Sequence, residues 1–314
     1  MKTEGYDHPI RVALFTVMGL SIETAVKVIN ERSDTELAVV MTCTGPKTRR
    51  SDAHMEVIQA LWDNGLYNVD VIVSNKRSKY ADLCAFYEVD LVVSMGYPWL
   101  LPADLLSDER IRLGAINFHN APLPQLRGPN ALGHAIMNGD TTFHFVIHRM
   151  EPQFDTGPIL IRKEAYLGTN ETFDGVFAPP ELVKESFYEA IDLVKLGDPG
   201  EVQIGVPTPA PKFDKEFRWI DFSDRAIDIH NKIRAHYGAR DIPKGALATI
   251  DGQVICITKS WIDLEDDQKE NSRTPIRIVE AAAGTVVSRH GHAFDIQCGD
   301  QVLRILEWHI VKSM

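Results

Sequence analysis

Ile10-Arg11-Val12-Ala13-Leu14-Phe15-Thr16-Val17 is the first apolar run in this sequence of 314 residues, and it decides the fold class. Its continuous apolar character predicts a strand that is buried on both faces. A helical pattern follows at residues 22–32, and further apolar runs alternate with helical segments up to residue 118. Such alternation is typical of a parallel sheet covered by helices on both sides. The first part of the chain therefore predicts an α/β fold with a Rossmann-like parallel sheet.

The later strands of this sheet indicate where a functional site is expected. They are expected at residues 37–41, 69–73, 90–94 and 114–118, with further helices at 57–65 and 80–87. Ligands of open parallel sheets bind at the carboxyl ends of the strands. The segments 94–102 and 117–128 are therefore the expected site. The turn after the first strand has one glycine and lacks G-x-G-x-x-G, so a dinucleotide cradle is not supported.

The proline-rich stretch Val206-Pro207-Thr208-Pro209-Ala210-Pro211 predicts a domain boundary. A helix expected over residues 173–196 precedes it, which assigns residues 1–205 to a catalytic domain and 206–314 to a smaller one. In the second part, a helix over 223–235 comes before short alternating strands. These strands predict a small, OB-like β-barrel, and they are expected at residues 246–250, 254–258, 284–288, 293–297 and 301–306.

Composition excludes several classes of protein. The 33 Lys and Arg against 44 Asp and Glu give a net charge of −11, which excludes a generally basic nucleic-acid binder but not a local basic patch. No apolar stretch is long enough to cross a membrane, and the first residues have no signal-peptide core. The four cysteines form no C-x-x-C pair, so we expect buried thiols, no metal and a reducing, cytoplasmic compartment.

Asn117 and His119 stand two residues apart at the end of the strand expected at 114–118, so their side chains project from the same face. An alternating strand at 143–150 leads into a turn that contains Asp155-Thr156-Gly157. Together these residues supply a hydrogen-bond donor, a titratable ring and an anion. Each is equally compatible with ordinary structure, because Asp and Gly favour turns and a strand-end histidine is common. Residue types alone leave both interpretations open.

The full motif is more specific. The pattern N-x-H-x₄-P-x₂-R-G-P over residues 117–129, followed by D-x-G at 155–157, resembles the 10-formyltetrahydrofolate-dependent formyltransferases. That family includes methionyl-tRNA formyltransferases and N-formyltransferases of sugars and other metabolites. Lys212, Ile220-Asp221-Phe222-Ser223 and Ile233-Arg234-Ala235 are similar to the family's entry into its C-terminal barrel. The similarity thus spans nearly the whole chain.

The resemblance implies a reaction and a set of site residues. It implies transfer of the formyl group of 10-formyltetrahydrofolate to a primary amine, without a metal. Asn117 would donate to the oxyanion, His119 would donate a second hydrogen bond, and Asp155 would support the imidazole charge. His144 and His148 are expected to be edge or core histidines. The residues implied to bind the folate are Met95, Gly96, Trp99, Leu101, Ala121, Pro122, Leu123, Pro124 and Gln153.

The chain departs from the family's pattern in three ways that bear on the acceptor. The family's S-L-L-P is Ala121-Pro122-Leu123-Pro124, the basic loop at 44–50 is short, and residues 206–314 carry 15 Lys and Arg against 16 Asp and Glu. Because a tRNA-binding domain is expected to be positive, a small-molecule amine such as an amino sugar is the favoured acceptor. Initiator Met-tRNA is the alternative. A 10-formyltetrahydrofolate hydrolase and a non-catalytic folate-binding module are lesser ones, since hydrolytic relatives lack the asparagine.

Overall fold

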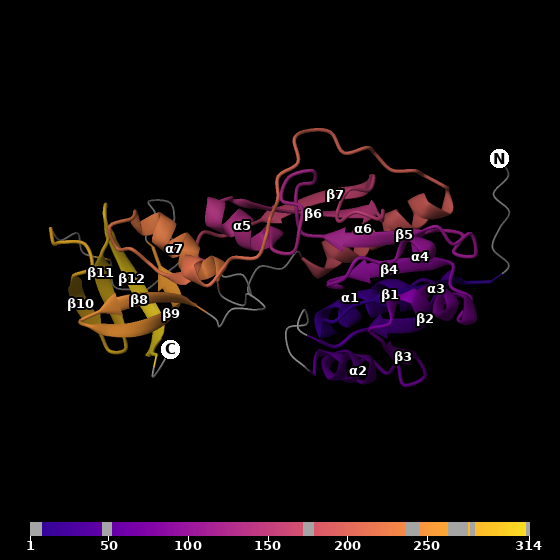
Figure 1. Ribbon diagram of the computed structural model, residues 1–314, viewed down its shortest axis with the longest axis horizontal. Helices are drawn as coiled ribbons and strands as arrows, with labels where there is room; N and C mark the ends of the chain where they lie inside the picture. Colours follow the sequence, from indigo (N-terminus) through magenta and orange to yellow (C-terminus); the bar gives the residue numbers. More distant parts are fainter. Residues whose placement is uncertain are drawn as a thin grey trace. The chain divides into compact units, whose positions relative to one another are not determined.

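The computed structural model describes residues 8–45, 52–171, 179–236, 245–262, 276 and 280–311 (Figure 1). Contacts between residues divide the chain into two compact units. The first contains Met1–Pro129, His144–Ala165 and Ala178–Ala210, and the second contains Asn130–Phe143, Tyr166–Phe177 and Pro211–Met314. The last change of unit falls at the end of the proline-rich stretch, while the domain limits of 1–205 and 206–314 stay a prediction.

The first unit is built on a seven-stranded sheet of order β3-β2-β1-β4-β5-β6-β7. The first five strands are parallel to their neighbours, as the apolar runs predict, and β6 is antiparallel to β5. The strands are β1 (Ile10–Phe15), β2 (Thr35–Thr42), β3 (Asp70–Val73), β4 (Leu91–Met95), β5 (Ala115–His119), β6 (Thr142–Arg149) and β7 (Ile159–Tyr166).

Burial follows position in this sheet. Every residue of the central strand β4 is buried, whereas the outermost strand β3 has no buried residue. One core cluster joins Ala13, Phe15 and Met41 of the sheet to Tyr80 and Cys84 of α3. The central strands are buried on both faces of the sheet. Their successive side chains point to opposite faces, so the side chains on both faces are apolar and the sequence is continuously apolar.

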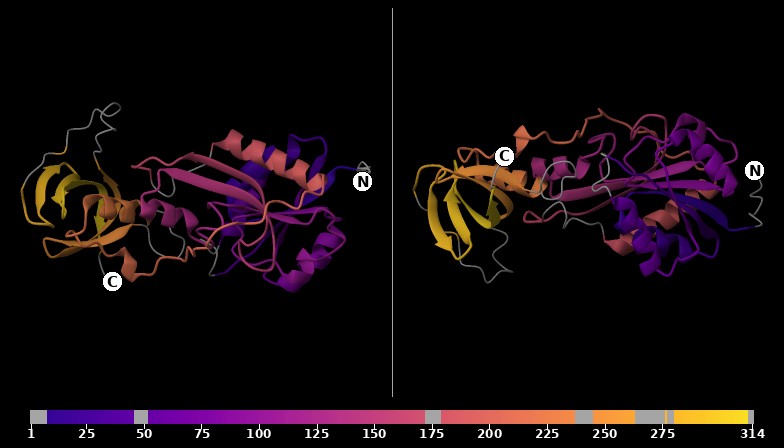
Figure 2. Two further views of the ribbon diagram at one scale, coloured as in Figure 1. Left: turned by 90° about the horizontal axis from the view of Figure 1, so that it is seen from above. Right: turned by 60° about the horizontal axis from the view of Figure 1, so that its bottom comes forward.

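Helices flank the sheet (Figure 2). Helix α1 contacts both α2 and α6, and α3 contacts α4. The sequence predicted α1, α2, α3 and α6, but neither the short α4 nor the single turn η1. Helix α6 begins at Pro180, after the extended Pro179, and not at the predicted residue 173. Residues 172–178 lie outside the described part. The helices are α1 (Gly19–Asn30), α2 (Ala53–Asp63), η1 (Arg77–Lys79), α3 (Tyr80–Phe86), α4 (Ala103–Leu106) and α6 (Pro180–Lys195).

The second unit contains a five-stranded sheet of order β10-β11-β12-β9-β8, in which neighbouring strands are antiparallel. Helix α7 packs on β9 and β12 through Phe222 just before it and Ala226, Ile229 and Ile233 on one of its faces. The elements are α5 (Ala131–Asn138), η2 (Glu216–Arg218), α7 (Ala226–Ala235), β8 (Ala246–Ile250), β9 (Gln253–Trp261), β10 (Val286–His290), β11 (Ala293–Gln297) and β12 (Val302–Ile310).

Most of these elements match the predicted ones. The predicted fold class is confirmed as an α/β part with a Rossmann-like, mostly parallel sheet and a separate part with an antiparallel sheet. The sequence analysis missed α5, which contacts α7 in the second unit, and β7. Gly139 ends α5 in a left-handed conformation with φ of +76°, the usual glycine signal after a helix. The acidic segment 263–270 lies outside the described residues.

Candidate active site

The end of β5 is the centre of the candidate site. Asn117 lies opposite Ser94 of the parallel strand β4 and opposite His148 of the antiparallel strand β6. His119 is the last residue of β5. Because Asn117 and His119 are two residues apart in one strand, their side chains project from the same face at its carboxyl end, as predicted.

Asp155 reaches this strand end from the loop between β6 and β7. The loop folds back tightly, because Gly157 packs so closely on β6 that a Cβ would lie 1.9 Å from the carbonyl oxygen of Arg149. Asp155 itself has φ of +56° and is 8% exposed. Gln203 fixes the turn by donating from Nε2 to the carbonyls of Asp155 and Gly157, each at 2.9 Å.

The R-G-P part of the motif supports the same turn. The amide of Gly128 donates to Asp155 Oδ2 at 3.0 Å. Gly128 has φ of +121°, and a Cβ there would lie 3.0 Å from the carbonyl oxygen of Ala210. Arg127 donates to Gln203 Oε1 at 2.5 Å and exchanges backbone hydrogen bonds with Thr208 and Ala210. Arg127 therefore holds the loop together.

The imidazole of His119 has one nitrogen that faces two acceptors. Its Nε2 lies 3.4 Å from the carbonyl oxygen of Leu126 and 3.6 Å from Asp155 Oδ2. A nitrogen between a carbonyl and a carboxylate carries a proton, because neither oxygen can donate one. In the neutral ring of His119, the lone pair is thus on Nδ1.

His148 belongs to the same cluster, which the sequence analysis did not expect. Its Nε2 lies 3.2 Å from Asn117 Nδ2 and 3.8 Å from Asp155 Oδ1. The ring is only 2% exposed, and burial lowers the pKa of His148 well below its ordinary value. The alternation of the strand explained this histidine as core. Only the antiparallel pairing of β6 with β5 places it beside Asn117.

The loop after β4 holds several of the residues implied to bind folate. Because Met95 pairs with Phe118, the glycine that follows, Gly96, begins its loop beside the end of β5. Trp99 has the guanidinium of Arg77 over its ring at 5.5 Å, and Arg77 donates to the Leu100 carbonyl at 3.1 Å. Leu101 is 2% exposed and packs in the core of the first unit.

The remaining implied folate residues lie on two other loops. Ala121 and Leu123 are 0% and 1% exposed, and the Leu123 carbonyl accepts a hydrogen bond from Arg162 at 2.8 Å. Pro124 is buried and Pro122 is partly exposed, whereas Gln153 is exposed on the turn before Asp155. Just before Ala121 in the chain, Asn120 Oδ1 is buried without a hydrogen-bond partner among the described residues. An acceptor left in this state next to His119 fits a ligand that brings amide or amine N–H donors.

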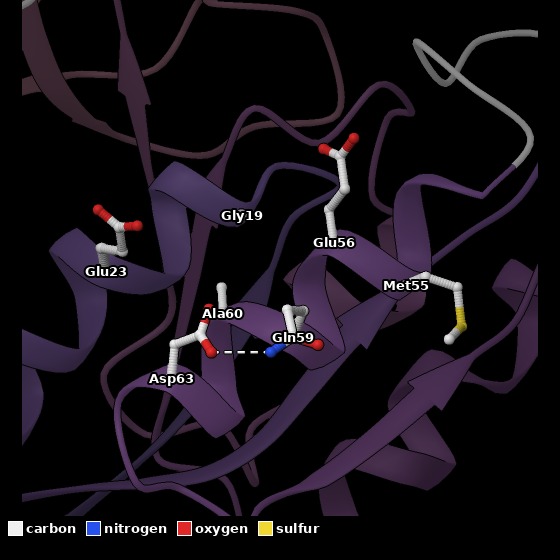
Figure 3. Close-up of a pocket in the computed structure, with 7 residues that line it drawn as sticks. All are labelled: Gly19, Glu23, Met55, Glu56, Gln59, Ala60 and Asp63. Atoms are coloured by element: carbon white, nitrogen blue, oxygen red, sulfur yellow. Dashed lines mark hydrogen bonds between the residues drawn. The ribbon is translucent and has the colours of Figure 1, made fainter.

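A surface pocket between α1 and α2 is separate from this cluster (Figure 3). Its lining includes the carboxylates of Glu23, Glu56 and Asp63 but no basic side chain, and Gln59 donates to Asp63 at 2.7 Å. Such a lining does not suit an anionic ligand. Within the described part of the chain, no group of three or more His, Cys, Asp and Glu residues is arranged to hold a metal ion, and no helix has the length and apolar character to cross a membrane.

Two family models match this chain. The model for formyl transferase matches residues 21–178, and the model for the formyl transferase C-terminal domain matches residues 212–313. The methionyl-tRNA formyltransferase of Sinorhizobium fredii is 30% identical over 251 residues, which are 76% of this chain and 72% of that protein. In two further relatives of the same name, the matched region covers 60% and 56% of the protein's length.

Two solved structures share the fold at low sequence identity. A variant of HypX from Aquifex aeolicus has a TM-score of 0.64 at 17% identity, over 97% of this chain and 45% of HypX. The N-formyltransferase of Helicobacter canadensis, in complex with folinic acid and dTDP-3-aminofucose, has a TM-score of 0.58 at 15% identity, over 96% of this chain and 100% of that chain. With the two matched domains and the N-x-H…R-G-P…D-T-G cluster at the end of β5, this chain belongs to the formyl transferase family.

Proposed function

We propose that this protein transfers a formyl group from 10-formyltetrahydrofolate to a primary amine. The observation that carries the proposal is the convergence of Asn117, His119 and Asp155 at one strand end, with 3.6 Å between His119 and Asp155. When bound, 10-formyltetrahydrofolate supplies the formyl group on its N10. The loop after β4 and the loop of residues 120–124 are the segments that would hold it, and the buried acceptor of Asn120 fits its N–H donors.

Each of the three residues has a distinct role in this proposal. Asn117 donates an amide N–H to the formyl oxygen as that oxygen gains negative charge, an interaction typically worth about 3 kcal/mol in the transition state. His119 would take a proton at Nδ1 from the attacking amine and give it to N10 as the bond between N10 and the formyl carbon breaks, because its Nε2 proton is held between Leu126 and Asp155. Asp155, fixed by the amide of Gly128, sets the orientation of the ring and balances the charge of the imidazolium.

The proposed acceptor is a small-molecule amine, such as an amino sugar. Of the cations after the linker that are candidates for tRNA contacts, Arg234 is 3% exposed and donates to the carbonyls of Gly168 and Glu171. Lys232 donates to the Trp219 carbonyl and lies over the ring of Phe217. Both cations thus have partners inside the protein. Lys47, Arg49, Arg50, Arg240 and Lys244 lie outside the described residues.

Initiator Met-tRNA is the second candidate acceptor, and the names of the relatives favour it. The Sinorhizobium fredii protein and the other relatives described above are methionyl-tRNA formyltransferases. The Helicobacter canadensis structure, in contrast, holds a nucleotide-linked amino sugar. The two acceptors differ so much in charge that one set of assays separates them.

The test follows the release of tetrahydrofolate from 10-formyltetrahydrofolate by purified protein. A transferase releases it only when an accepted amine is added, and we expect this result with an amino-sugar nucleotide. Release without any amine would identify a hydrolase, and the presence of Asn117 argues against it. Binding of folate without turnover under any condition would identify a non-catalytic module. Faster formylation of Met-tRNA than of any small amine would replace the proposed acceptor.

We also place the protein in a reducing compartment, the cytoplasm. The four cysteines, Cys43, Cys84, Cys256 and Cys298, are all buried, and no disulfide joins them. Cysteines that form no disulfides are typical of proteins that are kept in a reducing environment.

A further inference from the structure

His148 is a buried histidine to which the proposed reaction assigns no role. It is the cross-strand partner of Asn117 in the antiparallel pair of β6 and β5, so the two side chains stand next to each other on one face of the sheet. Its Nε2 lies 3.2 Å from the Asn117 amide nitrogen. A histidine that is 2% exposed and hydrogen-bonded to a proposed catalytic side chain requires an explanation beyond core packing.

The other ring nitrogen determines the tautomer of His148. Nδ1 lies 2.7 Å from the carbonyl oxygen of Arg149, which can only accept a hydrogen bond, so Nδ1 carries a proton. Burial lowers the pKa of the ring and keeps it neutral. A neutral ring with its proton on Nδ1 has a lone pair on Nε2, and that lone pair accepts a hydrogen bond from Asn117.

This lone pair determines which way the Asn117 amide is turned. In the opposite orientation, Asn117 Oδ1 would face the bare Nε2 of His148, and two acceptors would meet without a proton between them. The amide nitrogen therefore stays on the side of His148. One of its two N–H groups is held by the ring, and the other keeps a fixed direction and remains able to donate.

We propose that His148 is a positioning residue that orients the Asn117 amide for donation to the substrate oxygen, through the chain Arg149 carbonyl, His148 ring and Asn117 amide. The inference rests on the proposed formyl transfer and deepens it. Asp155 Oδ1 lies 3.8 Å from His148 Nε2, and the centre of the His119 ring lies 6.5 Å from the centre of the His148 ring. Four side chains thus form one cluster, namely Asn117, His119, His148 and Asp155. In this cluster His148 orients the Asn117 amide, and Asp155 orients the His119 ring.

Kinetics of two variants test this role. His148→Phe keeps a ring but removes the acceptor, and it is expected to lower kcat by about 10- to 100-fold, no more than the loss of one oxyanion donor. His148→Gln retains an acceptor on a side chain of similar reach, and it is expected to restore part of that loss. The affinity for the folate is expected to change by less than about twofold in both. His144→Phe, on the same strand, is the matched control and is expected to keep full activity.

A double-mutant cycle separates positioning from packing. If His148 acts through Asn117, then Asn117→Ala costs much less in the His148→Phe background than in the unmodified protein. A purely structural histidine would instead lower the melting temperature, leave the two losses additive, and show no recovery with Gln. Additive losses in the cycle, or an unchanged kcat in folded His148→Phe, would overturn the proposal.

The ring tautomer is a measurement that does not depend on turnover. The ¹⁵N chemical shifts of His148, assigned by their absence in His148→Phe, are expected to show a protonated Nδ1 and a bare Nε2 at pH 7. A protonated Nε2 would contradict the inference even if formyl transfer is observed. The expected tautomer in a protein that transfers no formyl group to any amine would leave the ring geometry correct and refute the proposed function.

Discussion

At the residue scale, the site depends on three polar side chains that one strand end and one turn bring together. Asp155 is held by several contacts, since the amide of Gly128 donates to its carboxylate and Gln203 donates to the carbonyls on both sides of Thr156. Groups held in this way lose little entropy when the substrate binds, and they keep their orientation during the reaction.

Removing any one of the three polar groups is expected to abolish most of the turnover. Asn117→Ala, His119→Ala and Asp155→Asn should each lower kcat by about 100-fold or more, because each removes an interaction made in the transition state. Asparagine is chosen at 155 because it tolerates the positive φ of that position. Steady-state kinetics measure the effect, and circular dichroism checks the fold. A variant that stays near full activity would remove its residue from the proposed mechanism.

The glycine of the D-T-G turn offers a second prediction at this scale. Gly157→Ala is expected to lower the free energy of unfolding by about 2 kcal/mol or more, because its Cβ would overlap the Arg149 carbonyl. Gly65→Ala is the matched control. Gly65 has φ of +75° but nothing within 4 Å of the new Cβ, so only the backbone cost of about 1 kcal/mol applies. Urea unfolding of both variants tests the ranking, and equal losses would contradict the close packing of this turn.

At the element scale, α7 is attached to the second unit by polar contacts as well as by its apolar face. His230 of α7 faces Ser260 of β9 at 2.8 Å through Nδ1 and the Thr169 carbonyl at 2.9 Å through Nε2. The neutral ring makes both hydrogen bonds, with Nε2 as donor and Nδ1 as acceptor. Burial lowers the pKa of His230 to about 4.

This buried histidine predicts a loss of stability in acid. An unfolded histidine titrates near pH 6.5, so between about pH 6.5 and 4 the unfolded chain binds a proton that the folded chain excludes. The stability is complete above that window, and the contribution of His230 falls by about 2 kcal/mol between pH 7 and pH 5. His230→Gln is expected to reduce the difference between urea unfolding at pH 7 and at pH 5. His309→Gln, at an exposed position, serves as the control and should leave that difference unchanged.

At the scale of the whole molecule, charge distinguishes the two candidate acceptors. Of the net charge of −11, the first 205 residues carry −10 and residues 206–314 carry −1. A negative surface repels a polyanion at long range, and binding to tRNA must overcome this repulsion through several phosphate contacts. Among the cations after the linker that are candidates for tRNA contacts, Lys232 and Arg234 lie in the described part of the chain. Both of them donate hydrogen bonds to carbonyls of the protein.

The salt dependence of the reaction is therefore expected to be shallow. Between about 50 and 200 mM salt, a protein with six or more phosphate contacts loses on the order of 1,000-fold in affinity. We expect kcat/KM for the accepted small amine to change by less than about tenfold over this range. The same assay with initiator Met-tRNA should show slower formylation. Rapid formylation of Met-tRNA with a steep loss in salt would decide for the tRNA.

The sequence by itself determined the fold class and most of the elements. A strand that is buried on both faces needs apolar side chains on both of them, as in residues 10–17 and 90–94. This requirement applies to each strand separately, so it can be recognised in the sequence. Helix α7 was equally predictable from the sequence, because its apolar residues recur with the helical period. The motif from Asn117 to Pro129, with Asp155 beyond it, was sufficient to indicate the family.

Only the tertiary structure decided which side chains meet. The alternating pattern of β6 says that His148 is on one face of a strand, but not which strand lies beside it. Pairing with β5 is set by long-range contacts, and it places His148 beside Asn117. The same holds for Gln203, which no sequence motif singled out. It lies 48 positions from Asp155 in the chain and donates a hydrogen bond to the turn that contains Asp155. A sequence records the period and chemistry of each segment, whereas register between segments depends on how their packed faces fit together.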